Sequence, residues 1–327
     1  MKTKSAQILE AIDNYCQTAY NDGHRSHLGA SQIGEECKRK LWYVFRWCFQ
    51  EQFSGRMYRL FNRGHLEENR FIEWLEGIGA KVWAEDYSAL WYHPESESYF
   101  LNPNCDEGDG LAHPIESSNV LFENHVHQAK LQGVKFPQFR ISDVLGHFGG
   151  SMDGICRLPP EFGIDEDILL EFKTNGTGAP FKKLCEEGLQ VAKPQHWAQV
   201  CTYGKKRGLN YVLYMNICKN DDSIHVELAK LDHAHGEQMI IKAEQIITSQ
   251  TPPARISNNC TYFGCKFCAA ANICHHNAPV ERNCRSCKFA TPVENAEWFC
   301  NAHNGVIPKD FIPKSCEAWA SINEVEN

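Results

Sequence analysis

The sequence predicts an α/β fold in which a central mixed sheet is flanked by helices. Two observations support this class. Apolar residues recur at helical spacing through residues 56–77, and short apolar or alternating runs typical of strands cover 139–146, 151–158 and 167–173. The chain has 327 residues, of which 43% are hydrophobic, which fits one elaborated domain and a small appendage.

The elements follow in an order that builds such a sheet. The expected helices cover 5–20, 56–77, 117–132, 180–188, 194–207 and 232–249. The expected strands cover 80–84, 139–146, 151–158, 167–173, 211–217 and 224–231. In the helix over 56–77, the apolar residues expected toward the core are Leu60, Phe61, Leu66, Phe71, Trp74 and Leu75.

Proline and polar residues mark several boundaries. Pro194 suits a first helical position, and Pro252 with Pro253 ends the helix over 232–249. Residues 94–137 are rich in Pro, Asn, Asp, Glu and His, which indicates an insertion. We therefore expect an N-terminal helical segment over 1–30, a core over 31–279 and a separate Cys-rich segment over 280–327.

Acidic and basic residues in a fixed order carry the strongest chemical signal. Asp153 lies in the Gly149–Gly154 segment, which resembles a turn, and Glu171-Phe172-Lys173 ends an apolar run. Because strand side chains alternate, Glu171 and Lys173 share one face while Phe172 points into the core. Two carboxylates suffice to hold Mg²⁺ or Mn²⁺, which supports phosphodiester cleavage. The alternative is that Asp153 opens a turn and Glu171 and Lys173 are exposed strand charges.

These residues resemble the successive motifs of the PD-(D/E)xK nuclease superfamily, RecB-like branch, over about residues 30–275. The matching segments are Gly64-His65-Leu66-Glu67-Glu68, Asp153, Glu171-x-Lys173 and Gln199-x3-Tyr203. The resemblance implies a restriction-endonuclease-like core with Asp153 and Glu171 as metal ligands and Lys173 as the catalytic lysine. It implies that Glu68 is an additional ligand. It also implies that Gln199 and Tyr203 contact DNA or order the site, with Gln195 as the alternative glutamine.

The chain has 16 cysteines, and eight of them lie between residues 260 and 316. In a chain without a secretion signal, clustered cysteines bind metal more often than they form disulfides. Cys265, Cys268 and Cys274 supply three thiolates, and Cys37 is the candidate for the fourth that a [4Fe–4S] cluster needs. One Cys before the core and three after it resemble the iron–sulfur subgroup of RecB-like nucleases. The alternative is a zinc knuckle that includes Cys260.

That subgroup includes the AddB-type nuclease domain and the CRISPR-associated exonucleases, in which the cluster ties the chain ends together. The residue that follows Cys37 is Lys38, where the subgroup usually has proline.

A second cysteine set follows the first. Cys284, Cys287, Cys300 and Cys316 have spacings that suit a tetrahedral structural Zn²⁺. His303 is an alternative ligand, and a loose tail with free cysteines is the alternative structure. Because residues 280–327 have few aliphatic side chains, a segment of this size is expected to need a metal staple.

The net charge of −8 argues against indiscriminate coating of DNA, because non-specific affinity comes largely from cations that contact phosphates. Two local basic patches are candidates for these contacts: Lys38–Arg46 and Lys205-Lys206-Arg207. In the first patch Trp42, Tyr43 and Phe45 are available to stack on unpaired bases. The alternative is that these aromatic residues pack in the core.

These observations favour a divalent-metal-dependent DNA nuclease, an exonuclease that acts on DNA ends or single strands through a metal-activated water. The alternative is a catalytically silent, metal-stapled DNA- or protein-binding module on a nuclease frame, and a weaker one is an RNA-directed enzyme. Protein partners in recombination, CRISPR adaptation or viral DNA processing are consistent with the resemblance. Without a signal peptide or an apolar membrane span, the chain is expected in the cytoplasm and away from membranes.

Overall fold

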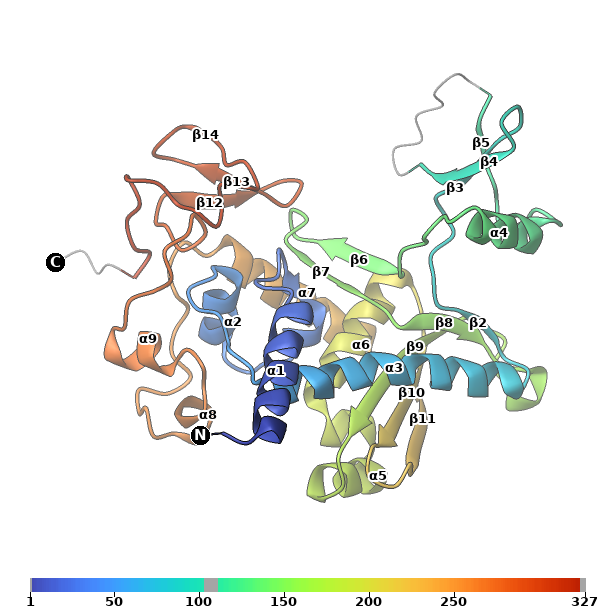
Figure 1. Cartoon of the computed structure of the whole chain (residues 1–327), viewed down its shortest axis with the longest axis horizontal. Helices are drawn as coiled ribbons and strands as arrows, with labels where there is room; N and C mark the ends of the chain where they lie inside the picture. Colours follow the sequence, from blue (N-terminus) through green and yellow to red (C-terminus); the bar gives the residue numbers. More distant parts are fainter. Residues whose placement is uncertain (1, 103–110, 324–327) are drawn as a thin grey trace.

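The computed structural model, which describes residues 2–102 and 111–323, is built on a five-stranded mixed sheet (Figure 1). Its strand order is β11-β10-β9-β8-β2. The strands are β2 (Lys81–Trp83), β8 (Gly154–Arg157), β9 (Ile168–Asn175), β10 (Tyr211–Cys218) and β11 (Ile224–Lys230). Strands β9 and β10 run parallel, whereas the other neighbours in this sheet are antiparallel. The fold class predicted from the sequence is confirmed.

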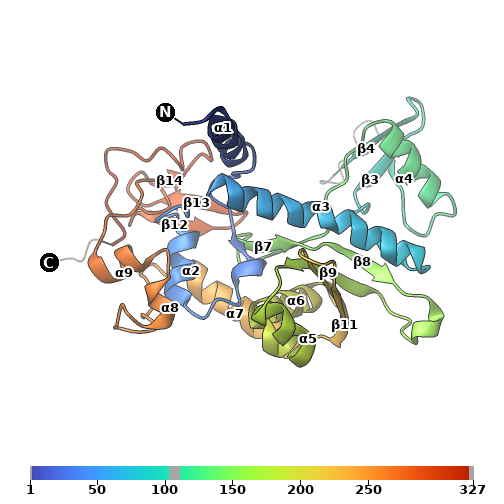
Figure 2. The same ribbon diagram turned by 60° about the horizontal axis from the view of Figure 1, so that its bottom comes forward.

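Helices cover both faces of this sheet (Figure 2). Helix α3 (Gly55–Gly77) lies on one face, and α5 (Ala179–Ala192) and α6 (Pro194–Arg207) lie on the other. Helix α7 (His233–Thr248) packs against α6. Helices α1 (Lys4–Ala19) and α2 (Lys38–Phe45) contact α3 and α7, respectively. No described helix is long and apolar enough to span a membrane.

Strand β9 gives the two faces of the sheet different chemistry. Leu170 and Phe172 point toward α3, where the ring of Phe172 stacks on Phe71 with centroids 4.8 Å apart. Glu171 points to the opposite face and is 0% exposed beneath α6. This alternation follows from the strand period, as the sequence indicated. The α3 side is an apolar core, whereas the α6 side contains buried polar groups.

Helix α3 confirms the helix predicted for 56–77, but its buried side is narrower than expected. Phe71 and Leu75 are buried, whereas Leu66 is 63% exposed and Leu60, Phe61 and Trp74 are also partly exposed. The N-terminal half of α3 lies against α1, where Arg59 forms an ion pair with Asp13.

A second sheet contains the segment that the sequence marked as a turn. Its strands are β1 (Leu28–Gly29), β7 (Phe148–Ser151) and β6 (Arg140–Asp143), in the order β1-β7-β6. The prediction of a turn was wrong for Gly149 and Gly150, which lie in β7. A Cβ atom on Gly150 would lie 2.5 Å from the Tyr203 hydroxyl oxygen, so this close approach requires glycine.

The region between β2 and β6 forms a small unit with its own core. Its sheet contains β3 (Leu90–His93), β4 (Ser98–Leu101) and β5 (His113–Pro114), beside α4 (Phe122–Leu131). The side chains that form this core are Leu90, Ile115, Val126, Ala129 and Phe136. Because Leu90 belongs to it, the unit includes residues before position 94.

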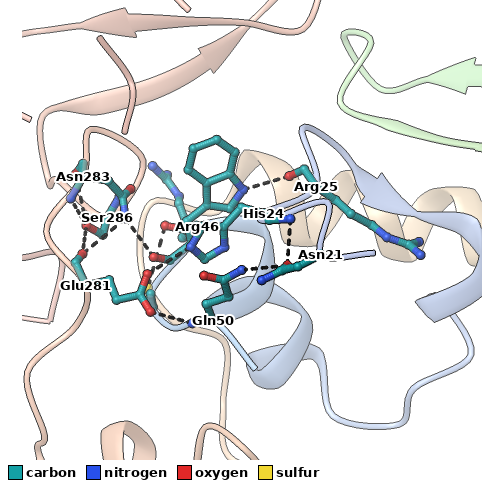
Figure 3. A network of polar contacts seen from close by, with 11 residues as sticks. Asn21, His24, Arg25, Arg46, Gln50, Glu281, Asn283 and Ser286 are labelled. Atoms are coloured by element: carbon teal, nitrogen blue, oxygen red, sulfur yellow. Dashed lines mark hydrogen bonds and ion pairs between the residues drawn. The ribbon is translucent and has the colours of Figure 1, made fainter. Parts of the chain in front are cut away.

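The C-terminal segment is packed onto the main core. It follows the short helices α8 (Phe263–Lys266) and α9 (Ala271–His276) and contains β12 (Ala290–Val293), β13 (Glu297–Cys300) and β14 (Gly305–Val306). Figure 3 shows the polar contacts at its base. Glu281 accepts a hydrogen bond from the backbone N–H of Gln50 (2.7 Å) and pairs with His24 (2.9 Å). Asn283 donates to the carbonyl of Trp47 (2.8 Å).

Two buried arginines lie at the same junction. The guanidinium of Arg285 lies over the rings of Phe45, Trp47 and Trp298, and Arg46 donates to the carbonyl of Ala290 (2.7 Å). Both arginines are at most 1% exposed. Cation–π contacts and backbone carbonyls therefore hold the C-terminal segment to α2.

His147 makes this junction sensitive to pH. Its Nε2 donates to the carbonyls of Val293 (3.0 Å) and Glu297 (2.9 Å), and burial lowers its pKa from 6.5 to about 4. The folded protein keeps this ring neutral, whereas the unfolded chain takes up a proton below its ordinary pKa. We expect the free energy of unfolding to fall by roughly 2 kcal/mol from this group as the pH drops from 6.5 to 4.

Urea unfolding at a series of pH values measures this loss. His147→Gln retains a side-chain N–H donor but does not titrate, so its stability should fall less over the same range. An identical pH dependence in both proteins would contradict the role of His147.

Candidate functional site

Helix α6 brings three predicted site residues together over β9. The side-chain amide of Gln199 donates to Glu171 Oε2 (3.3 Å) and lies 3.4 Å from the hydroxyl of Tyr203. Tyr203, one helical turn later, donates to the carbonyl of Ser151 (2.8 Å). Gln195 is exposed. Of the two candidate glutamines, the structure therefore places Gln199 against the buried carboxylate.

Asp153 joins this group from the bend between β7 and β8. Its Oδ2 accepts a hydrogen bond of 2.6 Å from the backbone N–H of Phe172, which fixes the carboxyl beside β9. Burial raises the pKa of Asp153, and the charge of Glu68 adds to this effect, while Lys173 and the Phe172 N–H oppose it. Among the groups that favour the ionised form, the largest effect comes from a nearby cation.

Lys173 supplies that cation. Its ammonium forms a close ion pair with Glu171 Oε1 and donates to the carbonyl of Phe172 (3.2 Å). Burial lowers the pKa of Lys173, but the carboxylates of Glu171 and Asp153 outweigh burial and hold that pKa above its ordinary value. Burial raises the pKa of Glu171 to about 7, and Lys173 opposes this rise. The exposed-charge alternative is therefore wrong for Glu171, which is fully buried.

Glu68 approaches from the other face of the sheet. It lies on α3 with 28% of its side chain exposed, and its Oε1 is 3.2 Å from Nδ1 of His65. Its charge raises the pKa of both Asp153 and Glu171, so the three carboxyls lie within electrostatic reach of one another. Across residues 2–102 and 111–323, however, no three His, Cys, Asp or Glu side chains are arranged to hold a metal ion as they stand.

One oxygen of Glu171 fits the expectation of a divalent cation. In this structure the Lys173 ammonium is in contact with Oε1, and no other donor of the described residues bonds to this buried oxygen. Buried carboxylate oxygens normally have such partners. Oxygen is also the donor that Mg²⁺ and Mn²⁺ prefer, so Glu171 and Asp153 have the right chemistry for either ion.

Polar residues of β10 extend the site in a way that sequence reasoning missed. Nδ1 of His196 lies 2.8 Å from the Tyr214 hydroxyl, and the amide of Asn216 donates to the same hydroxyl (3.1 Å). Burial lowers the pKa of His196 to about 3, so this ring is neutral. The signal was available in the sequence, because Tyr214 and Asn216 alternate in a buried strand as Glu171 and Lys173 do.

The first cysteine set converges despite its separation in sequence. Cys37 at the start of α2 lines one cavity together with Cys265, Cys268 and Cys274. The cavity itself is small, with a volume of about 20 Å³. Cys260 lies near enough for its charge to raise the pKa of Cys265, but it does not line the cavity.

The thiols of the second cysteine set lie within electrostatic reach of Cys284, although within the described residues they are not arranged as a set of metal ligands. Burial raises the pKa of the Cys284 thiol, and the nearby thiolates of Cys316, Cys287 and Cys300 raise it further. Nε2 of His303 lies 3.6 Å from Sγ of Cys316. Both candidate zinc ligands, the thiol of Cys316 and the imidazole of His303, therefore lie at this point.

The two basic patches are less available than the sequence indicated. Trp42, Tyr43 and Phe45 are buried, so the expectation that they stack on bases was wrong and the core-packing alternative holds. In the second patch Lys205 pairs with Glu237 (3.0 Å) and Lys206 pairs with Asp143 (2.6 Å). Most of this positive charge is neutralised within the protein.

Comparisons with known proteins give weak likenesses. No family model matches the chain, and no curated protein matches it. A solved structure described as SSO0001 is 14% identical, with a TM-score of 0.38, over 82% of this chain and 96% of that chain. An alkaline exonuclease (LHK-Exo) from Laribacter hongkongensis is 13% identical, with a TM-score of 0.37, over 71% of this chain and 90% of that one.

LHK-Exo in complex with dAMP gives 13% identity and a TM-score of 0.37 over 70% of this chain and 90% of that chain. At these values the comparisons do not assign the chain to a family.

The buried charge at Asp153 should reduce stability. Because its pKa is raised in the folded protein, its charged form opposes folding at neutral pH. We expect Asp153→Asn, whose amide oxygen can still accept from Phe172, to increase the free energy of unfolding by about 1 kcal/mol without added divalent cations. Urea unfolding measures this change. Asp310→Asn, at an exposed carboxylate, should change stability by less than about 0.5 kcal/mol, and a less stable Asp153→Asn would contradict the expectation.

Proposed function

We propose that this protein is a divalent-metal-dependent DNA nuclease that hydrolyses phosphodiester bonds. The observation that carries the proposal is the pair of acidic side chains, Glu171 and Asp153, held beside Lys173 at a buried point of the sheet. Burying charged side chains costs free energy, so we expect them to be kept only where they serve a function. Carboxyl groups with shifted pKa values beside a lysine are typical of active sites. Oε1 of Glu171 already contacts one cation, the Lys173 ammonium, which supports cation binding at this point.

The side chains have separate tasks in this proposal. Asp153 and Glu171 would hold Mg²⁺ or Mn²⁺, with Glu68 as a further ligand, and the ion would offset phosphate charge and activate water. Lys173 would orient the attacking water and stabilise negative charge that develops on the phosphate. Gln199 orients Glu171 through its amide, and Tyr203 holds Ser151 and thereby the strand that leads to Asp153.

The negative net charge of the protein favours contact with only a short stretch of DNA. With a net charge of −8, and with Lys205 and Lys206 of the second basic patch held in ion pairs, the protein is poorly suited to coat a long duplex. We therefore propose an exonuclease that acts on DNA ends or single strands. Its protein partners would be found in recombination, CRISPR adaptation or viral DNA processing, the settings that the sequence resemblance implies.

We also propose that the cysteine sets hold two different metals. The cavity between Cys37, Cys265, Cys268 and Cys274 suits a [4Fe–4S] cluster, whose ligands stand at separate corners of a cube. Arg39, Lys40 and Arg255 line the same cavity, and the charge of Lys40 opposes the rise that burial causes in the pKa of Cys268. Cys284, Cys287, Cys300 and Cys316 suit Zn²⁺, with His303 as the alternative ligand.

Substitution of the charged residues tests the nuclease. With Mg²⁺ or Mn²⁺, purified protein should degrade end-labelled DNA, and Asp153→Ala, Glu171→Ala and Lys173→Ala should each reduce the rate at least about a thousandfold. Lys183→Ala on the exposed side of α5 is the control and should retain activity. Single-stranded DNA, duplex DNA and RNA are compared in the same assay.

Full activity in the three alanine variants would contradict the assignment. DNA binding without cleavage by the unmodified protein would favour the silent binding module instead.

Elemental analysis of anaerobically purified protein tests the two metals. Cys37→Ala and Cys268→Ala should lose iron, sulfide and visible absorbance, because the cluster loses a ligand. Cys284→Ala should lose zinc and keep iron. Cys185→Ala, at an exposed cysteine outside both sets, should keep both metals. Zinc in both sets with no iron would refute the cluster.

A further inference from the structure

The polar layer around Glu171 and Lys173 continues across the neighbouring strand. In the parallel register of β9 and β10, Glu171 pairs with Tyr214 and Lys173 pairs with Asn216. Residues in register on adjacent strands point to the same face of a sheet. Helix α6 covers this face and contributes His196 (Figure 2). Asn216 is therefore the neighbour of Lys173 within the sheet.

A chain of hydrogen bonds sets the orientation of the Asn216 amide. Because His196 is neutral, its Nδ1 can accept the hydroxyl proton of Tyr214, and the Tyr214 oxygen then accepts from Nδ2 of Asn216. The amide oxygen of Asn216 consequently points away from Tyr214. That oxygen is buried and has no hydrogen-bond donor within the described part of the chain. Leaving a buried acceptor without a donor costs free energy, which indicates that a donor bonds to this oxygen in another state of the protein.

The Lys173 ammonium, in turn, would need an acceptor other than Glu171 once a divalent cation is bound. In the present structure its ammonium occupies Glu171 Oε1. If Glu171 binds a divalent cation, the ammonium and the cation repel each other at that oxygen. Lys173, whose side chain is only 27% exposed, then needs a new acceptor close by.

We propose that Asn216 is a positioning residue whose amide oxygen accepts the Lys173 ammonium when Glu171 binds a divalent cation. This inference rests on the proposed function and adds a second state to it. The exchange frees Glu171 for the ion and keeps the amine beside the reacting phosphate. Tyr214 and His196 act through Asn216, because they hold its amide in the accepting orientation.

Mn²⁺ binding to the full chain, measured by electron paramagnetic resonance without DNA, tests the exchange. Asn216→Leu should weaken binding about tenfold, because Lys173 then competes with the ion for Glu171. Asn216→Asp supplies an oxygen acceptor for Lys173 together with a negative charge and should bind Mn²⁺ at least as tightly as the unmodified protein. Tyr214→Phe removes the hydroxyl that holds the Asn216 amide in its orientation. It should weaken Mn²⁺ binding by a smaller factor than Asn216→Leu does.

The decisive comparison uses a Lys173→Met background. Without the ammonium, Asn216→Leu should leave Mn²⁺ affinity unchanged, because nothing competes for Glu171. Thr202→Val removes another buried hydroxyl of α6, which donates only to the Ala198 carbonyl, and should have no effect in either background. Circular dichroism and melting temperature verify that each variant is folded.

Two results would overturn the inference. One is an unchanged Mn²⁺ affinity in folded Asn216→Leu, and the other is an equal loss in both backgrounds, which would make Asn216 merely structural. If the unmodified protein binds Mn²⁺ and cleaves DNA but shows no coupling, only the role of Asn216 fails. If it neither binds Mn²⁺ nor cleaves DNA, the proposed function fails, and the exchange fails with it.

Discussion

The structure depends on charged side chains being held inside strand β9, which is covered by helices on both faces. Glu171 is fully buried, and its charge is supported by the Lys173 ammonium and by the amide of Gln199. A buried carboxylate without such partners would take up a proton or destabilise the fold. The strand therefore requires α6 at its polar face and the bend at Asp153 beside it. The arrangement of the candidate site follows from this requirement.

The two ends of the chain meet on the same side of the molecule. Cys37 faces Cys265, Cys268 and Cys274 across one cavity, while Arg285 from the C-terminal segment lies among aromatic rings of the α2 region and β13. Both junctions join segments separated by more than two hundred positions in the sequence. Closing loops of this length costs conformational entropy on folding, and the contacts at these junctions offset that cost.

Local pattern predicted much of the fold and part of the site. The helices that became α1, α3, α4, α5, α6 and α7 were expected from the sequence pattern, and so were the strands of the five-stranded sheet. Gly149 and Gly150 were misassigned, because glycines in a strand resemble a turn when the close approaches of Ile141 to Gly149 and of Tyr203 to Gly150 are unknown. Trp42 and Tyr43 were left open between base stacking and core packing, since composition cannot show which neighbours cover a side chain.

The sequence by itself determined the alternation of β9, because a strand must send Glu171 and Lys173 to one face and Phe172 to the other. It also determined which cysteines were available, through their number and spacing. Only the tertiary structure decided that Gln199 rather than Gln195 meets Glu171, and that Asn216 lies beside Lys173. Those neighbours depend on strand register and helix placement, which arise from packing between segments that are distant in the chain.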